Sequence, residues 1–130
     1  MRKFLLITIV ILMALSIFGG VLTDRDYRIL LRDNENYYGE EYSMDVYINQ
    51  WVSYEDHDLY LAVSLDNHDH TIIIIDDFST NNFPLVAEGD YLDIENIEYW
   101  GAVTYDTAGN YEKTVPVFIA GYSTYIDLMN

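Results

Sequence analysis

Apolar and polar residues alternate with a period of two along much of the chain after residue 41, which is the pattern of β-strands with one buried face. In residues 59–65 the odd positions are all leucine or valine, so we expect them to form the face that points into the core. Residues 71–75 form a β-branched run without polar alternation, as expected of a strand buried on both faces. Strands are predicted in this way over residues 42–52, 59–65, 71–75, 91–99 and 115–125.

The segments around these strands complete the prediction. The alternation slips within residues 91–99, and a β-bulge near Asn96 would explain the slip. After residue 100 we expect a long hairpin connection with a turn at residues 107–110. The chain therefore divides into residues 1–23, a polar lead-in at 24–41 that forms a short helix or is irregular, and an all-β domain at 42–130 that is a small barrel or sandwich.

The first 23 residues have the layout of a signal peptide. Arg2 and Lys3 give a positive start, and the apolar run that follows ends at Gly19 and Gly20. Uncut, residues 4–22 are long enough to span a bilayer as an N-terminal anchor helix with the basic end inside. Cleavage and retention both stay open. In either case we expect an exported domain, secreted or anchored to the outer face of the cytoplasmic membrane by residues 4–22.

Acidic residues dominate the exported part. The chain has 22 acidic and 6 basic residues, and two of the basic ones lie at positions 2 and 3. The exported part therefore carries four basic against 22 acidic residues, a net charge of −18. This charge repels phosphate backbones and anionic headgroups, so we expect no nucleic-acid partner and no membrane contact except through the N-terminal segment. The absence of cysteine excludes disulfides, zinc–thiolate sites and a cysteine nucleophile.

Short motifs at four places along the chain resemble a known family. They are Tyr38-Gly39 before the first strand, Glu88-Gly89-Asp90 before the fourth, Tyr105 and Gly109 in the connection, and Val-Pro-Val-Phe-Ile-Ala from Val115 in the fifth. With them, residues 37–128 resemble the OB (oligonucleotide/oligosaccharide-binding) fold, and more narrowly the OB-like domains of exported Gram-positive bacterial and prophage proteins. The resemblance implies a five-stranded Greek-key barrel that binds ligands around strands two and three. Members usually carry a glycine inside strands one and four, which the predicted ranges lack.

Aromatic residues are the candidate ligand contacts. We expect Tyr47, Trp51 and Tyr60 on the outer faces of the first two strands, and Trp100 and Tyr105 in the long connection. Tyrosine and tryptophan on a rigid sheet form contact surfaces for proteins or sugars at low entropic cost. The alternative for any one tyrosine is a core position with its hydroxyl in water. We predict an exported module that binds a protein or an uncharged glycan, without a cofactor.

A cluster of metal-competent side chains supports an alternative prediction. It consists of Asp66, His68, Asp69 and His70. The alternative is a metal-dependent module in which this loop holds calcium or zinc. The simpler interpretation is that Asp, Asn and His are ordinary hairpin-turn residues.

Catalytic motifs are weak. Gly121-Tyr122-Ser123 lacks the second glycine of a nucleophile elbow. The sequence has no Gly-rich phosphate-binding loop. We therefore predict no enzymatic activity.

Overall fold

The computed structural model describes residues 20–54, 57–65, 70–77 and 86–129, which are mostly β-sheet. In these ranges the strands are β1 (Gly20–Val21), β2 (Glu41–Tyr54), β3 (His57–Ser64), β4 (His70–Asp77), β5 (Tyr91–Asp106), β6 (Glu112–Ile119) and β7 (Tyr125–Met129). A short α-helix, α2 (Asp24–Leu30), and a 3₁₀ helix (Glu35–Tyr37) lie between β1 and β2. None of the helices in the described ranges has the length and apolar character needed to cross a membrane. Of the anchor or signal helix expected at residues 4–22, residues 4–19 lie outside the described residues.

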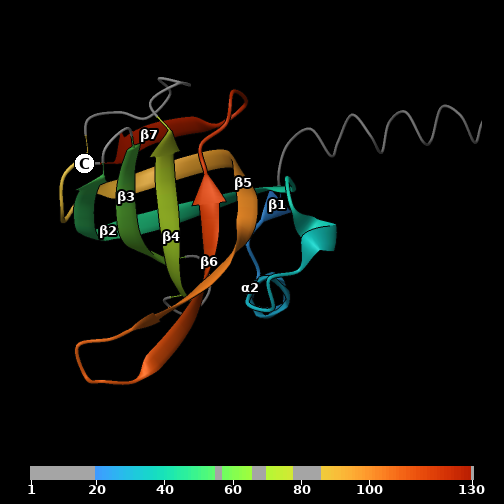
Figure 1. Ribbon diagram of the computed structural model, residues 1–130. Helices are drawn as coiled ribbons and strands as arrows, with labels where there is room; N and C mark the ends of the chain where they lie inside the picture. Colours follow the sequence, from blue (N-terminus) through green and yellow to red (C-terminus); the bar gives the residue numbers. More distant parts are fainter. Residues whose placement is uncertain (1–19, 55–56, 66–69, 78–85, 130) are drawn as a thin grey trace, which may run out of the picture.

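Five of the strands pair in a closed circuit within one mixed sheet (Figure 1). β2 pairs antiparallel with β3 and β5, β3 pairs with β4, and β5 pairs with β6. A parallel pairing of β4 with β6, from Ile73–Val117 to Ile75–Ile119, completes the circuit. β1 adds to β2 in parallel and β7 adds to β5 antiparallel. Four strands of the circuit lie where they were predicted. The fifth, predicted over residues 115–125, ends at Ile119, and Tyr125 belongs to the separate strand β7; β1 was not predicted.

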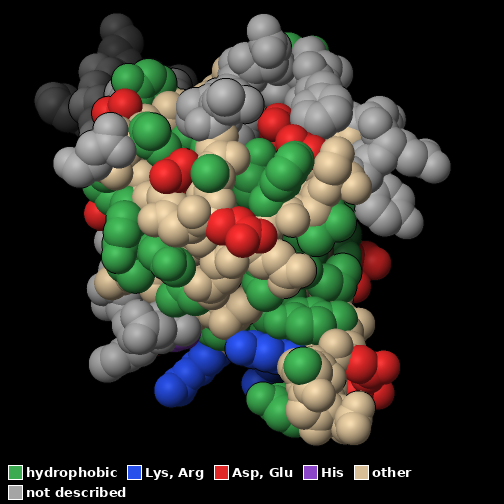
Figure 2. Space-filling view, turned by 90° about the vertical axis from the view of Figure 1, so that its left-hand side faces the viewer, with side chains coloured by type: hydrophobic (Ala, Val, Ile, Leu, Met, Phe, Trp, Pro, Cys, Tyr) green, Lys and Arg blue, Asp and Glu red, His purple; other side chains and the backbone are tan. Residues whose placement is uncertain are grey.

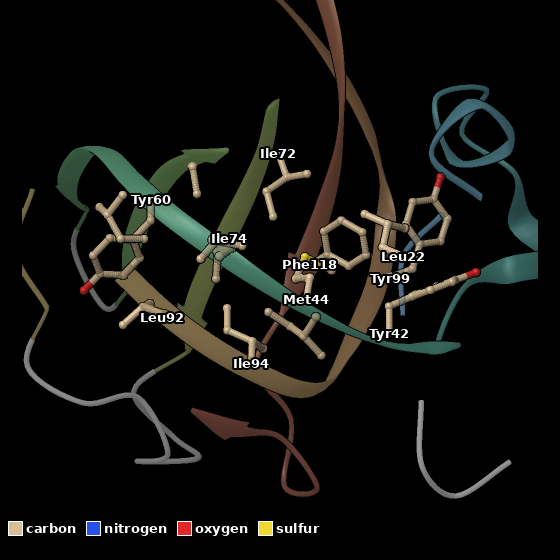
Figure 3. Close-up of a cluster of buried hydrophobic side chains, with 14 of the residues drawn as sticks. Leu22, Tyr42, Met44, Tyr60, Ile72, Ile74, Leu92, Ile94, Tyr99 and Phe118 are labelled. Atoms are coloured by element: carbon tan, nitrogen blue, oxygen red, sulfur yellow. The ribbon is translucent and has the colours of Figure 1, made fainter. Parts of the chain in front are cut away.

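The core lies inside this circuit, where alternate residues of each strand meet (Figure 3). From Tyr42 to Ile48 the predicted alternation along β2 is confirmed, since the even-numbered residues are buried. It fails after the bulge between Ile48 and Gln50, because Val52 is 42% exposed. The Phe118 ring makes edge contacts with Tyr42 and Tyr99, each with ring centroids 6.0 Å apart. The buried Tyr99 hydroxyl donates a 2.6 Å hydrogen bond to the carbonyl of Leu30 at the end of α2. The core therefore joins the helix to the sheet.

The side chains of β3 point the opposite way from the prediction. Tyr60, Ala62 and Ser64 are buried inside the circuit, whereas the odd-numbered aliphatic residues of 59–63 are half-buried on the outer face. Ala62 lies opposite Ile48 of β2, and residues directly opposite each other share a face of the sheet. The inward residues of β2 thus fix the orientation of β3. The prediction that Leu59, Leu61 and Val63 face the core was therefore wrong, and the two faces of β3 are exchanged relative to it.

Two bulges interrupt the pairing of β5. Between Ile94 and Ile97 the strand has one more residue than β2 opposite, and Asn96 has a φ of 59°. This confirms the bulge predicted near Asn96. A second bulge, which was not predicted, leaves Trp100 as the extra residue before Gly101 in the pairing with β6.

β5 and β6 continue beyond the sheet as a two-stranded arm (Figure 1). β5 runs to Asp106 and β6 begins at Glu112. The predicted turn between them is confirmed, because the Asn110 N–H donates to the Thr107 carbonyl at 3.0 Å. We call residues 102–116 the β5–β6 arm.

The described fold begins at Gly20, before the expected boundary at residue 24. Leu22 is fully buried in the core. Thr23 caps α2: its hydroxyl accepts from the Asp26 N–H at 3.1 Å, and the Asp26 carboxylate accepts from the Thr23 N–H at 3.1 Å. The last four residues of the 1–23 segment therefore belong to the described fold, through the β1–β2 pairing, the buried Leu22 and the Thr23 cap, and the helix anticipated in the lead-in is α2.

Candidate functional site

The structure does not bring the five predicted aromatic residues together. Tyr60 lies in the core, with 3% of its surface exposed. Burial, followed by the carboxylates of Asp58 and Asp76, raises the pKa of Tyr60 to about 12. Tyr60 is therefore a core residue and does not belong to the surface that a ligand can contact.

Tyr47 and Trp51 lie on β2, four residues apart. The Tyr47 ring packs against Tyr91 of β5, with centroids 5.0 Å apart. Trp51 is 47% exposed and lies opposite Tyr60 in the sheet register. Tyr91 and Trp100 are separated along β5 by roughly 30 Å of extended strand, so Tyr47 and Trp100 belong to different surfaces.

Trp100 lies at the base of the β5–β6 arm, and Tyr105 lies on the arm. Trp100 is 60% exposed, whereas Tyr105 is half-buried. Burial, and then the proximity of Tyr105, raise the pKa of Tyr27 on α2. The Tyr27 hydroxyl in turn donates to the carbonyl of Thr71 on β4 at 2.8 Å. Tyr105 thus belongs to the contact between the arm, α2 and β4.

Of the predicted metal-binding residues, Asp66, His68 and Asp69 lie outside the described residues. The Nε2 atom of His70 lies 2.9 Å from Oδ1 of Asp24, and its ring stacks on Tyr27 with centroids 4.0 Å apart. His70 therefore joins β4 to α2. Within the described ranges no group of three or more His, Cys, Asp or Glu side chains is placed to hold a metal ion.

An apolar hollow of about 380 Å³ lies on the outer face of the sheet at the base of the arm. One charged residue lines it, and the others are apolar or glycine. We call it the Trp100 groove; its lining residues are Asp33, Leu59, Ile73, Ile75, Trp100, Gly101, Ala102, Val103 and Val117. This arrangement suits the binding of an apolar group, because it offers aliphatic and indole surface with a single carboxylate.

The sheet register explains why aliphatic side chains gather there. Leu59 of β3 lies opposite Ile75 of β4, and Ile73 of β4 lies opposite Val117 of β6. Opposite residues share a face, so three neighbouring strands present one outward aliphatic row. The β-branched run at 71–75 was interpreted as buried on both faces. On the outer face Ile73 and Ile75 are instead half-buried and line the groove.

Asp33 closes the groove on the side of the loop that follows α2. Its Oδ1 atom accepts hydrogen bonds from the Tyr38 hydroxyl at 2.5 Å and from the Ala102 N–H at 3.1 Å. These two bonds, in that order, lower the pKa of the Asp33 carboxyl. The hydrogen bond to Asp33 is the main cause that raises the pKa of Tyr38 to about 12. Asp33 is thus an ionised carboxylate at neutral pH.

Gly101 makes the close approach of Asp33 possible. It has a φ of +140°, and a Cβ atom at this position would lie 2.9 Å from Oδ1 of Asp33. The glycine therefore shapes the groove together with the Trp100 bulge. Neither Asp33 nor the aliphatic lining was predicted from the sequence, because they meet only through strand register and the second bulge.

Basic side chains are gathered away from the groove lining. Arg25 and Arg28 are exposed on α2 and Arg32 is exposed just after it, and Lys113 of the arm donates to the Thr71 hydroxyl at 3.0 Å. Figure 2 shows Lys and Arg side chains at the lower end of the molecule, with acidic and hydrophobic side chains over the rest of the visible face. None of these four basic residues lines the Trp100 groove.

Comparison of the chain with protein-family models, with curated proteins and with solved structures finds no match.

Proposed function

We propose that the chain is an exported, non-enzymatic OB-like module that binds a protein partner through the Trp100 groove. The observation that carries this proposal is an apolar hollow of about 380 Å³ in which Asp33 is the one charged lining residue. Exposed apolar surface that is continuous across several strands marks an interaction site more often than chance exposure of a single side chain does.

The closed circuit of five strands supports an OB-like barrel. The OB-fold barrel is a partly open Greek-key barrel, and the parallel β4–β6 pairing, with three residue pairs, is the shortest junction of the circuit. Gly101 supplies a glycine inside β5, the fourth strand of the circuit, just after the end of the predicted range. β3 and β4, the second and third strands of the circuit, supply Leu59, Ile73 and Ile75 to the groove, which supports binding near the strands that OB folds commonly use.

The chemistry of the groove favours a protein over an uncharged glycan. Sugar hydroxyls need several polar partners in addition to an aromatic platform. Among the side chains that line the groove, only the Asp33 carboxylate and the Trp100 indole N–H can form hydrogen bonds with a ligand. Aliphatic or aromatic side chains of a protein match the remaining surface.

Export is supported by the layout of the first 23 residues and by the strongly acidic domain that follows. Because Leu22 and the Thr23 cap belong to the fold, we expect any cleavage to precede Gly20. Cleavage at the small residues Ala14 and Ser16 meets this condition. Retention of the segment as an anchor meets it as well.

A capture experiment tests the proposal. The purified protein and its Trp100→Ala and Trp51→Ala variants are immobilised and exposed to cell-envelope extracts. We expect a partner protein that the wild type and Trp51→Ala retain and that Trp100→Ala loses, since only Trp100 lines the groove. Equal retention by folded Trp100→Ala would reject this groove as the binding site.

A further inference from the structure

The Trp100 groove combines an aliphatic floor with a carboxylate that is only partly used by the protein. Both hydrogen bonds to Asp33 end on Oδ1, and no described residue donates to Oδ2. The hydrogen bonds from Tyr38 and Ala102 favour the ionised form of Asp33. This ionised carboxylate, which is exposed beside an apolar lining, attracts a cationic group more than a neutral one.

Trp100 adds a second preference for cations. Its indole is 60% exposed and lines the same groove as Asp33. The face of an indole attracts ammonium and guanidinium groups through its quadrupole. Two different lining residues therefore favour positive charge.

The charge of the whole domain acts in the same direction. Residues 20–130 carry four basic and 22 acidic residues, a net charge of −18. This field attracts cationic molecules and repels a second copy of the same chain. None of the four basic residues lines the groove.

We propose that the Trp100 groove recognises a cationic ligand that carries an apolar group, which in a protein partner is a basic segment with an aliphatic or aromatic anchor side chain. This inference rests on the proposed function and names the chemistry of the partner. The anchor fills the hollow between Leu59, Ile75 and Val117, and the cation lies between Asp33 and the Trp100 indole.

Three small probes that share a benzene ring test the inference on the full chain. Benzylamine carries a positive charge, benzyl alcohol none and benzoate a negative one. Each is titrated while the amide signals of Ala102 and Val103 and the indole N–H of Trp100 are followed by nuclear magnetic resonance. The indole N–H of Trp51 reports binding outside the groove.

We expect all binding to be weak and benzylamine to bind about threefold more tightly than benzyl alcohol, with benzoate weakest. Asp33→Asn should reduce the preference of benzylamine over benzyl alcohol, because Asn keeps the left-handed backbone and the shape while losing the charge, and the Trp100 indole and the net charge account for what remains. Asp127→Asn on β7 changes the net charge by the same amount at an exposed position, so it should keep the preference. Raising the salt concentration should weaken the preference in the wild type without any mutation.

The outcomes separate this inference from the proposed function. Groove binding with equal affinity for the three probes would overturn the cation preference and leave the groove as a binding site. A preference that Asp33→Asn retains in full would overturn the role of Asp33. No shift of the groove signals with any probe would count against both. Loss of the preference in Asp127→Asn as well would assign it to net charge and overturn the role of Asp33.

Discussion

The Tyr38 hydroxyl donates a 2.5 Å hydrogen bond to Oδ1 of Asp33, five residues earlier in the chain. The same oxygen accepts the Ala102 N–H, so the pair ties the loop after α2 to the first residue of the arm. Asp33 has a φ of 51°, a conformation that Asp and Asn adopt more readily than most residues. The contact therefore depends on both the backbone and the charge of one residue.

Asp33→Asn should lower the pKa of Tyr38 from about 12 toward its ordinary value, because the hydrogen bond to the carboxylate is the main cause of the shift. The measurement is a pH titration of the Tyr38 ring followed by nuclear magnetic resonance. Glu35→Gln is the control, since Glu35 makes the smallest contribution to the shift. An Asp33→Asn protein whose Tyr38 titrates as in the wild type would contradict the assignment.

Alkaline pH should destabilise the protein. The pKa of Tyr60 is raised to about 12 and that of Tyr42 is raised as well, in both cases mainly by burial. In the unfolded chain these groups titrate near 10, so from about pH 10 upward the native state holds protons that the unfolded state has lost. Stability is therefore fully present below about pH 10 and falls as the pH rises toward the folded pKa values.

Urea unfolding at a series of pH values measures this slope. Tyr60→Phe should make the alkaline fall of the unfolding free energy shallower, because phenylalanine has no proton to lose. Tyr122→Phe, at a side chain that is 86% exposed, is the matched control. A slope that Tyr60→Phe leaves unchanged would show that Tyr60 does not contribute.

Leu22→Ala should destabilise the domain by about 2–5 kcal/mol, since the leucine side chain is fully buried. A chain that begins at Asp24 should lose at least as much, because it also lacks β1 and the Thr23 cap. A chain that begins at Gly20 keeps all three features and should match the uncut protein in urea unfolding. Equal stability of the Gly20 and Asp24 chains would mean that β1 and Leu22 are dispensable.

Gly101→Ala should destabilise the protein by about 1–3 kcal/mol through backbone strain and contact with Asp33. It should also displace Asp33 and raise its carboxyl pKa toward the ordinary value. Gly20→Ala is the control, since an added Cβ there meets nothing within 4 Å. Thermal unfolding and the pH titration of Asp33 provide the two measurements. A Gly101→Ala protein with unchanged stability and an unchanged Asp33 pKa would refute the requirement for glycine at this position.

The strands were predictable because their apolar residues recur with a fixed period. β2 shows this most clearly, with Met44, Val46 and Ile48 all inside. The orientation of β3 was not predictable, because Leu59 and Tyr60 are both apolar enough for the core. Only the pairing with β2 decides between them. β1 escaped prediction because two residues are too few for a pattern.

The candidate site was less accessible to sequence analysis than the fold. Trp100 is 60% exposed, but it lies within β5 and not in the connection where it was expected. Its neighbours Asp33 and Leu59 are far from it in the sequence and reach it through register, the bulge and a left-handed backbone residue. When each strand is considered alone, its outward aliphatic residues cannot be distinguished from core residues by the sequence pattern.

The closed circuit has a consequence for how the chain is made. β2 emerges early from the ribosome, yet its second partner, β5, follows only after residue 90, and β6 closes the circuit later still. A nascent chain that lacks its last strands has open sheet edges and no complete core. Such non-local pairing makes folding slow relative to local structure formation. Completion of the native state therefore waits until β6, which closes the circuit, has been synthesised.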